Sequence, residues 1–216
     1  MRTGKLISRI SIGVFIVFEG GDGGGKSTQV GLLVEALRGQ GRTVVPTREP
    51  GGTRIAEKIR RVILDPDNLE LCDRAEALLY AASRAEHVHH VIAPALERGE
   101  IVVSDRYLDS SVIYQGLGRG LGRDAVRDLN LWATEGLLPN LTIVLDVPVD
   151  FGLDRVGTPD RLELAPREMH ARIRDYYLEM AANDPIHYVV INARQSIEAI
   201  AATVLAHVDA LLAADA

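Results

Sequence analysis

The fold of this 216-residue chain is decided by Gly20-Gly21-Asp22-Gly23-Gly24-Gly25-Lys26-Ser27, which fits the pattern G-x-x-x-x-G-K-[ST]. The stretch lies between an apolar run at 12–18 and a segment of helical period that ends near Gly39. A glycine-rich turn lets backbone N–H groups approach phosphate oxygens, and the following helix points its positive dipole end at them. Lys26 would bridge the transferred phosphate and Ser27 would bind Mg²⁺. The motif therefore predicts a nucleoside triphosphate site.

Short β-branched runs alternate with longer stretches of helical period along the whole chain, which is typical of a parallel sheet covered by helices. Five runs are apolar enough to be strands buried on both faces, namely 12–18, 43–45, 101–104, 141–146 and 188–191. Further helices are predicted at 53–64, 73–98, 123–134, 166–182 and 196–213, with a kink at Pro94 in the second of these. We expect an α/β fold with a five-stranded parallel sheet flanked by helices.

Composition and charge limit the classes of protein to which the chain can belong. Hydrophobic residues make up 47% and charged residues 25%, as in globular proteins, and the length predicts one domain. Thirty acidic and 24 basic residues give a net charge of −6, which argues against a non-specific nucleic-acid binder. The apolar run at 10–18 is shorter than the roughly 20 residues that span a bilayer. We expect a cytoplasmic protein without a membrane partner, in which residues 1–11 form an N-terminal extension.

Charged residues follow the predicted strands, at the edge of a parallel sheet where ligands gather. Arg48 follows the second strand, and Asp105 and Arg106 follow the third. A guanine-nucleotide switch would carry Asn-Lys-x-Asp, which is absent, and a motor ATPase would have Glu where Arg106 stands. Two arginines can clamp a second phosphate with bidentate geometry. The residues therefore favour a kinase that phosphorylates a phosphate-bearing acceptor.

Asp22 is a carboxylate inside the predicted phosphate loop, where phosphates would repel it. Two roles remove the repulsion, namely contact with the metal ion or with a sugar hydroxyl. A third possibility is that Asp22 only tightens the turn through a local hydrogen bond.

Four blocks in this order resemble the thymidylate kinase family, the nucleoside monophosphate kinases that transfer the γ-phosphate of ATP to dTMP. They are Phe18 to Thr28, Arg48-Glu49-Pro50-Gly51-Gly52-Thr53, Asp105-Arg106-Tyr107, and Ser110-Ser111 with Tyr114-Gln115-Gly116. The resemblance spans almost the whole chain. It implies a P-loop NTPase fold, a single nucleoside monophosphate kinase domain over residues 1–216, and a homodimer.

The resemblance also implies roles in binding the acceptor. Tyr80 would stack on thymine and Arg84 would hydrogen-bond the edge of the base. Ser111 would read the pyrimidine, and Tyr114 would crowd the 2′ carbon and so disfavour ribonucleotides. The set of residues expected to bind dTMP is Asp22, Arg48, Tyr80, Arg84, Arg106, Ser110, Ser111, Tyr114 and Gln115.

On the donor side, the resemblance implies an ATP site formed by the phosphate loop through Thr28, with Asn192 near adenine. Ser27 and Asp22 would hold Mg²⁺. The phosphate loop contains no arginine, so a short lid at about 155–165 would supply one. The expected catalytic residues are Lys26, Asp105, Arg106, Arg155 and Arg161.

The residues alone leave two alternatives open. The first is a kinase for another monophosphate or a small metabolite. The second is a nucleotide-binding regulatory protein without catalytic activity, in which the arginines on the acceptor side would have no purpose.

Overall fold

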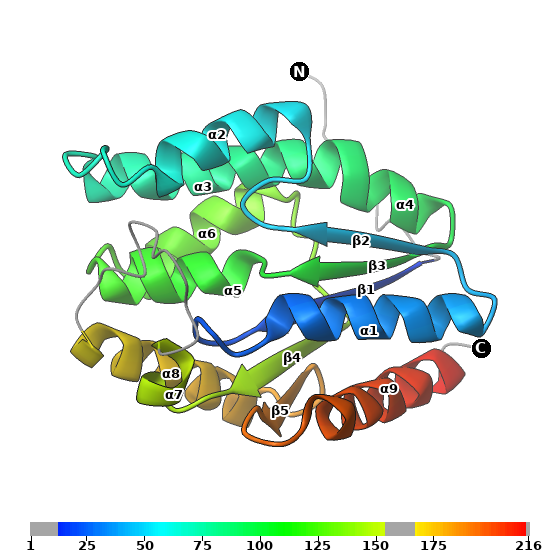
Figure 1. Cartoon of the computed structure of the whole chain (residues 1–216). Helices are drawn as coiled ribbons and strands as arrows, with labels where there is room; N and C mark the ends of the chain where they lie inside the picture. Colours follow the sequence, from blue (N-terminus) through cyan, green and yellow to red (C-terminus); the bar gives the residue numbers. More distant parts are fainter. Residues whose placement is uncertain (1–12, 154–166, 215–216) are drawn as a thin grey trace.

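The computed structural model describes residues 13–153 and 167–214. Its centre is a five-stranded parallel sheet in the order β2-β3-β1-β4-β5 (Figure 1). The strands are β1 (Val14–Glu19), β2 (Val44–Arg48), β3 (Ile101–Asp105), β4 (Leu141–Asp146) and β5 (Tyr188–Asn192). Each predicted strand is confirmed, with bounds that differ by no more than three residues. The predicted N-terminal extension at 1–11 lies outside the described residues.

The helices predicted from apolar periodicity are also confirmed. They are α1 (Lys26–Gly39), α2 (Arg54–Leu64), α3 (Asp73–His87), α4 (Ala93–Glu97), α6 (Arg123–Ala133), α8 (Arg167–Asn183) and α9 (Ile197–Ala214). The sequence did not predict α5 (Leu108–Ser111), the π-helical turn η2 (Val112–Gly118) that continues it, or α7 (Val149–Leu153). The predicted helix at 73–98 is divided by a second π-helical turn, η1 (Val88–Ile92), just before Pro94. Proline has no N–H to donate to the preceding turn, which explains why the α-helical ladder stops there.

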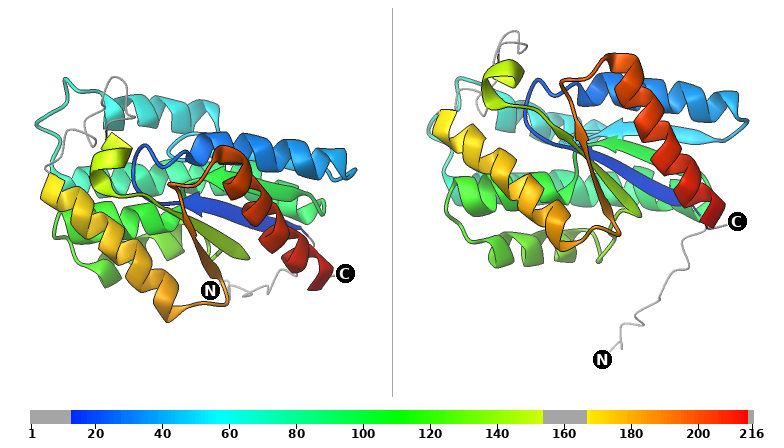
Figure 2. Two further views of the ribbon diagram at one scale, coloured as in Figure 1. Left: turned by 60° about the horizontal axis from the view of Figure 1, so that its bottom comes forward. Right: turned by 90° about the horizontal axis from the view of Figure 1, so that it is seen from below.

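Alternating residues of β1 point to opposite faces of the sheet, and both faces are buried. Ile16 and Phe18 pack with α1 and α9, whereas Phe15 and Val17 pack with η1 and α4. Figure 2 shows α8 and α9 flanking β5. Two helical layers therefore enclose the sheet.

The last helix, α9, is long and apolar enough to span a membrane by length and composition. One such helix is weak evidence for a membrane span, because a helix in a protein core can be equally long and apolar. In this chain Ile200, Val204 and Val208 of α9 are buried in the core beside α1.

The parallel strands all end at one edge of the sheet, so the loops that follow β1, β2 and β3 meet there (Figure 1). In the register, Phe18 of β1 lies beside Asp105 of β3, and Asp105 lies beside Arg48 of β2. Residues far apart in the sequence are thus brought together at this edge.

Replacing Ile143 tests how strongly the fold depends on the central strands. Ile143 of β4 is fully buried, so Ile143→Ala should lower the free energy of unfolding by about 3 kcal/mol, from lost apolar contact and the cavity left behind. Ile186 is 82% exposed, and Ile186→Ala should cost no more than about 0.5 kcal/mol. Urea unfolding of the two variants measures both values. Equal losses would contradict the described core.

Candidate active site

The phosphate loop joins β1 to α1, and its glycines are required by the backbone. Gly20 has φ of 124°, and a Cβ there would lie 2.4 Å from the carbonyl oxygen of Leu145. Gly23 has φ of 70°, and its Cβ would overlap the backbone of Gly152. The loop therefore tolerates no side chain at these positions, and it leads into the N-terminus of α1 as a phosphate site requires.

Lys26 lies over this loop. Its Nζ donates hydrogen bonds to the carbonyl oxygens of Gly20 at 3.1 Å and Gly21 at 2.8 Å. Burial and the nearby positive charge of Arg106 lower the pKa of Lys26 to about 8. A phosphate anion beside the ammonium would relieve both effects, so the site favours an anionic ligand.

Ser27 pairs with Asp105 at the end of β3. The Ser27 hydroxyl donates to Oδ2 of Asp105 at 2.6 Å. Hydroxyl and carboxylate oxygens are hard ligands that Mg²⁺ prefers, so this pair fits the predicted metal. The sequence analysis assigned the metal to Ser27 and Asp22, and that assignment stays a prediction; in this structure the Asp22 carboxylate contacts Arg106 and Tyr114.

Arg106 stands at the centre of the site, in the left-handed backbone conformation with φ of 72°. Its guanidinium donates to the carbonyl oxygen of Gly20 at 3.2 Å and to the hydroxyl of Ser110 at 3.1 Å. It also forms a short ion pair with Asp22. The first turn of α5 and the phosphate loop are thus joined through one side chain.

Asp22 accepts a second hydrogen bond, from the hydroxyl of Tyr114 at 3.0 Å. Burial would raise the pKa of Asp22, but Arg106, Lys26 and Tyr114 together hold it below its ordinary value. The Arg106 guanidinium also lies 5.4 Å from the centre of the Tyr114 ring. Asp22 is therefore an ionised carboxylate held between a cation and a phenol.

Glu19 lies beside Arg106, with 3.9 Å between its Oε2 and Nη1 of the guanidinium. The sequence analysis missed this residue. This fully buried carboxylate accepts from the backbone N–H of Tyr107 at 2.9 Å and from the hydroxyls of Ser110 and Tyr177, each at 2.7 Å. A carboxylate at the end of an otherwise apolar strand is the sequence signal that could have indicated it. The sequence offered no comparable signal for Tyr177.

A cavity of about 360 Å³ opens at this edge of the sheet. It is lined by residues 23–27 of the phosphate loop and by eight residues predicted to bind the acceptor, namely Asp22, Arg48, Tyr80, Arg84, Arg106, Ser110, Tyr114 and Gln115. Thr28 lines it as well. Residues predicted to bind the donor and residues predicted to bind the acceptor therefore line one cavity.

Four predicted site residues in the described part of the chain do not line this cavity, namely Gly20, Gly21, Ser111 and Asn192. Ser111 is buried behind it, where its hydroxyl accepts a hydrogen bond from Arg84 at 3.1 Å. Asn192 ends β5 and accepts from the backbone N–H of Arg194 at 2.9 Å. The predicted lid at about 155–165, with Arg155 and Arg161, lies outside the described residues.

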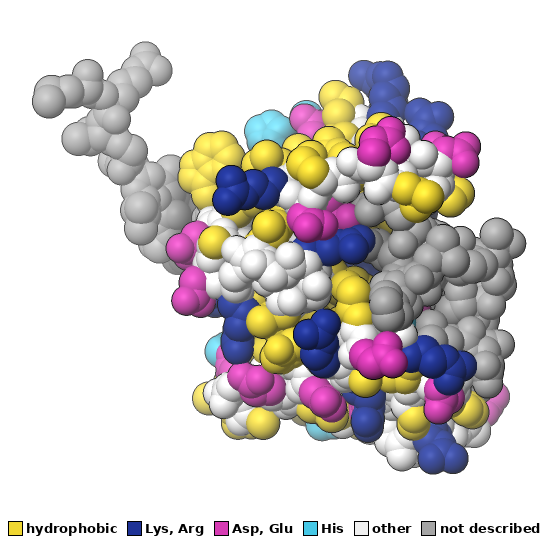
Figure 3. Space-filling view, turned by 90° about the vertical axis from the view of Figure 1, so that its left-hand side faces the viewer, with side chains coloured by type: hydrophobic (Ala, Val, Ile, Leu, Met, Phe, Trp, Pro, Cys, Tyr) yellow, Lys and Arg dark blue, Asp and Glu magenta, His cyan; other side chains and the backbone are white. Residues whose placement is uncertain are grey.

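The other acceptor-side residues differ in how firmly they are held. Arg48 is half exposed and pairs with Glu57 at 3.0 Å. Gln115 is buried, and its side-chain amide donates to Glu76 at 2.8 Å. Viewed from the edge toward which the strands point (Figure 3), Lys and Arg side chains lie among Asp and Glu side chains without forming a continuous patch. Among the described residues of this face, local contacts and not a broad positive surface would therefore hold an anion.

The lowered pKa of Lys26 predicts a specific pH dependence of stability. Folded Lys26 releases its proton near pH 8, whereas unfolded lysine keeps it to above pH 10, so stability should rise with pH in between. From pH 7.5 to 9.5 the free energy of unfolding should increase by about 2 kcal/mol in the native chain relative to Lys26→Met. Lys58 is exposed, and Lys58→Met should keep the native pH dependence. Denaturant unfolding across this range measures the difference, and identical slopes in all three proteins would refute the shift.

Comparison with known proteins agrees with this geometry. The sequence model of the family Thymidylate kinase matches residues 18–204. The chain is 53% identical over 201 residues to the thymidylate kinase of Leifsonia xyli, covering 91% of this chain and 95% of that protein. It is 51% identical over 203 residues to the thymidylate kinase of Desulforudis audaxviator, covering 93% and 92%.

A solved structure is similar as well. The crystal structure of thymidylate kinase from Ehrlichia chaffeensis superposes with a TM-score of 0.75 at 31% identity, covering 91% of this chain and 98% of that one. The predicted P-loop NTPase fold is thereby confirmed. The family model over residues 18–204 and these relatives show that the chain belongs to the thymidylate kinase family.

Proposed function

We propose that this chain is an ATP-dependent kinase that transfers the γ-phosphate of ATP to dTMP, giving dTDP and ADP. The observation that carries the proposal is the joining of Lys26 of the phosphate loop and Arg106 of the acceptor side in one cavity. A nucleotide switch needs only the first of these cations. A phosphotransferase needs both, because two phosphates must meet in line.

On the donor side, the phosphate loop and Lys26 would hold the triphosphate of ATP. Ser27 and Asp105 would hold Mg²⁺, which supplies neutralisation of the charge on the phosphate oxygens. Their hydrogen bond at 2.6 Å already places the two oxygens together, so little rearrangement is required.

On the acceptor side, Arg106 and Arg48 would bind the phosphate of dTMP. This phosphate is mostly dianionic at neutral pH, because its second pKa is about 6, and the reaction needs no general base. Asp22, ionised and held by Arg106 and Tyr114, would accept a hydrogen bond from the 3′-hydroxyl of the deoxyribose. The Tyr114 ring would crowd the 2′ position.

At the base end of the cavity, Tyr80 would stack on thymine, and Arg84 and Gln115 would face its edge. Ser111 would act on the base only through Arg84, since its hydroxyl is bound to that guanidinium. Arg155 or Arg161 would supply the lid cation that reaches the transferred phosphoryl group, and Asn192 would border adenine. We further propose that residues 1–216 act as one domain in a cytoplasmic homodimer.

Replacing Arg106 tests the mechanism. Arg106→Ala should lower the rate of dTDP formation by about 10³-fold, because a cation that offsets the charge of the transferred phosphoryl group is lost. Binding of a non-hydrolysable ATP analogue should persist. Arg123 forms an exposed ion pair with Glu179 away from the cavity, so Arg123→Ala should retain full activity. Full activity of Arg106→Ala would refute the role given to this residue.

A panel of acceptors tests the substrate. ADP release should be fastest with dTMP among dTMP, dUMP, dCMP, UMP, CMP, AMP and GMP. Faster transfer to another monophosphate would keep the kinase and overturn the assignment of the base pocket, and no transfer to any of them would overturn the kinase itself.

A further inference from the structure

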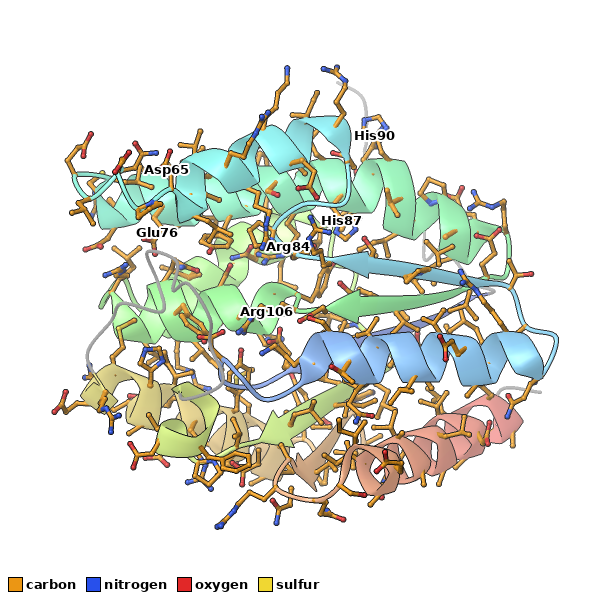
Figure 4. All side chains as sticks on the ribbon, viewed as in Figure 1. Asp65, Glu76, Arg84, His87, His90 and Arg106 are labelled. Carbon is orange, nitrogen blue, oxygen red and sulfur yellow. The ribbon has the colours of Figure 1, made fainter. Side chains whose placement is uncertain are left out.

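Behind the base end of the cavity, a chain of buried polar contacts runs from Thr47 to Arg84. The Thr47 hydroxyl lies 2.6 Å from Nε2 of His87, and Nδ1 of His87 lies 2.9 Å from Oε1 of Glu49. The other oxygen of Glu49 accepts from Nε of Arg84 at 2.6 Å. His87, Glu49 and Arg84 are each no more than 4% exposed. In Figure 4, His87 and Arg84 lie side by side between α3 and the sheet, whereas His90 points away from it.

The direction of the hydrogen bond between His87 and Glu49 follows from the chemistry of Glu49. The Glu49 carboxylate can only accept, so Nδ1 of His87 donates to it. Nε2 of His87 shares its hydrogen bond with the Thr47 hydroxyl. Burial opposes ionisation of Glu49, but Arg84 and His87 hold its pKa below the ordinary value. Glu49 is therefore a carboxylate fixed from two sides.

The guanidinium of Arg84 donates four hydrogen bonds to buried neighbours. Besides the bond to Glu49, Nη1 donates to Ser111 and Asn130, and Nη2 donates to the carbonyl oxygen of Tyr107 at 3.0 Å. A guanidinium has five N–H groups. Four have acceptors, which leaves one Nη2 hydrogen without an acceptor in the described part of the chain, on a side chain that lines the cavity.

His87 also fixes the loop that follows β2. A Cβ at Gly52 would lie 2.5 Å from the His87 ring, so the backbone of that loop packs directly against the imidazole. His87 thus joins α3, the end of β2 and the loop that contains Glu49. It does not line the described cavity, so any effect on substrate must pass through other residues.

We propose that His87 is a positioning residue for recognition of the base: it fixes Glu49, and Glu49 holds Arg84 so that its one remaining N–H faces the ligand. The proposal rests on the proposed function, in which Arg84 contacts the edge of thymine. A fixed donor favours a carbonyl acceptor over an amino group at the same place on the ring. His87 therefore contributes to discrimination between thymine and cytosine bases without touching either.

Two substitutions of His87 test the contacts of its two ring nitrogen atoms one at a time. Asn places a side-chain amide near the position of Nδ1 and can still donate to Glu49. Gln reaches toward the position of Nε2, keeps the contact with Thr47 and loses the contact with Glu49. The matched controls are His90→Asn and His90→Gln, since His90 is 56% exposed on the opposite side of the same helical segment.

The measured quantities are the KM for dTMP, the KM for ATP, kcat, and the base preference, which is the dissociation constant of 5-methyl-dCMP divided by that of dTMP. 5-Methyl-dCMP carries an amino group where dTMP carries the C4 carbonyl. His87→Gln should raise the KM for dTMP about tenfold and lower the base preference by a similar factor. The reason is that the Glu49 carboxylate and Arg84 lose their fixed geometry. The KM for ATP should stay unchanged. His87→Asn and both His90 variants should remain near native values.

A purely structural role for His87 predicts a different result. Both His87 variants would then lower kcat and thermal stability together, with the base preference unchanged, and this outcome would overturn the proposal. If His87→Gln does not fold, Thr47→Val serves instead, because it frees Nε2 of His87. It should reduce the base preference a few-fold, and an unchanged preference in that variant would also overturn the proposal.

Arg84→Met in the same assays distinguishes failure of this inference from failure of the proposed function. An unchanged base preference in Arg84→Met would show that Arg84 does not read the base, and the proposed base pocket would be wrong. A lost preference in Arg84→Met with an unchanged one in His87→Gln would overturn the positioning role of His87 alone.

Discussion

The ion pair between Arg106 and Asp22 is the interaction on which the rest of the site depends. Asp22 belongs to the loop after β1, and Arg106 to the turn after β3. Parallel pairing of these strands puts Phe18 beside Asp105 and so brings the two loops together. Arg106 and Lys26 are two cations near the phosphate loop that repel each other, and Asp22 is one of the carboxylates that offset this repulsion, together with Glu19. In the proposed function, Asp22 would thus allow a donor site and an acceptor site to share one cavity.

The interior of this site is unusually polar for a protein core. Glu19 and Glu49 are both buried, and burial of an isolated carboxylate is costly. Each is fully engaged, Glu19 by N–H and O–H donors from α5, its preceding turn and α8, and Glu49 by Arg84 and His87. Buried networks of this kind add little net stability but fix orientation. The chain thus uses its buried charges to place two arginines.

The sequence was sufficient for the sheet and for the phosphate loop, because both depend on local patterns. An apolar run and the spacing of the loop glycines are each contained in a stretch of fewer than ten residues. It was insufficient for the helical segment at 108–118, where Gly116 and Gly118 interrupt the apolar period and packing against α6 and α8 decides the conformation. It was also insufficient for side-chain partners. That Ser27 meets Asp105, and Asp22 meets Arg106, follows from the pairing of β1 with β3, which no local pattern contains.

The arginines proposed to bind the acceptor differ in how firmly they are held. Arg48 is half exposed, and its ion pair with Glu57 is of the surface kind worth no more than about 1 kcal/mol, so a phosphate can displace Glu57 easily. Arg84 is 2% exposed and bonded through four of its five N–H groups, so it cannot follow a ligand that fits poorly. Phosphates are common to all nucleotides, whereas the base distinguishes them. In the proposed function, the contacts at the phosphate end would adapt to the ligand, whereas the fixed donor of Arg84 would restrict which base is accepted.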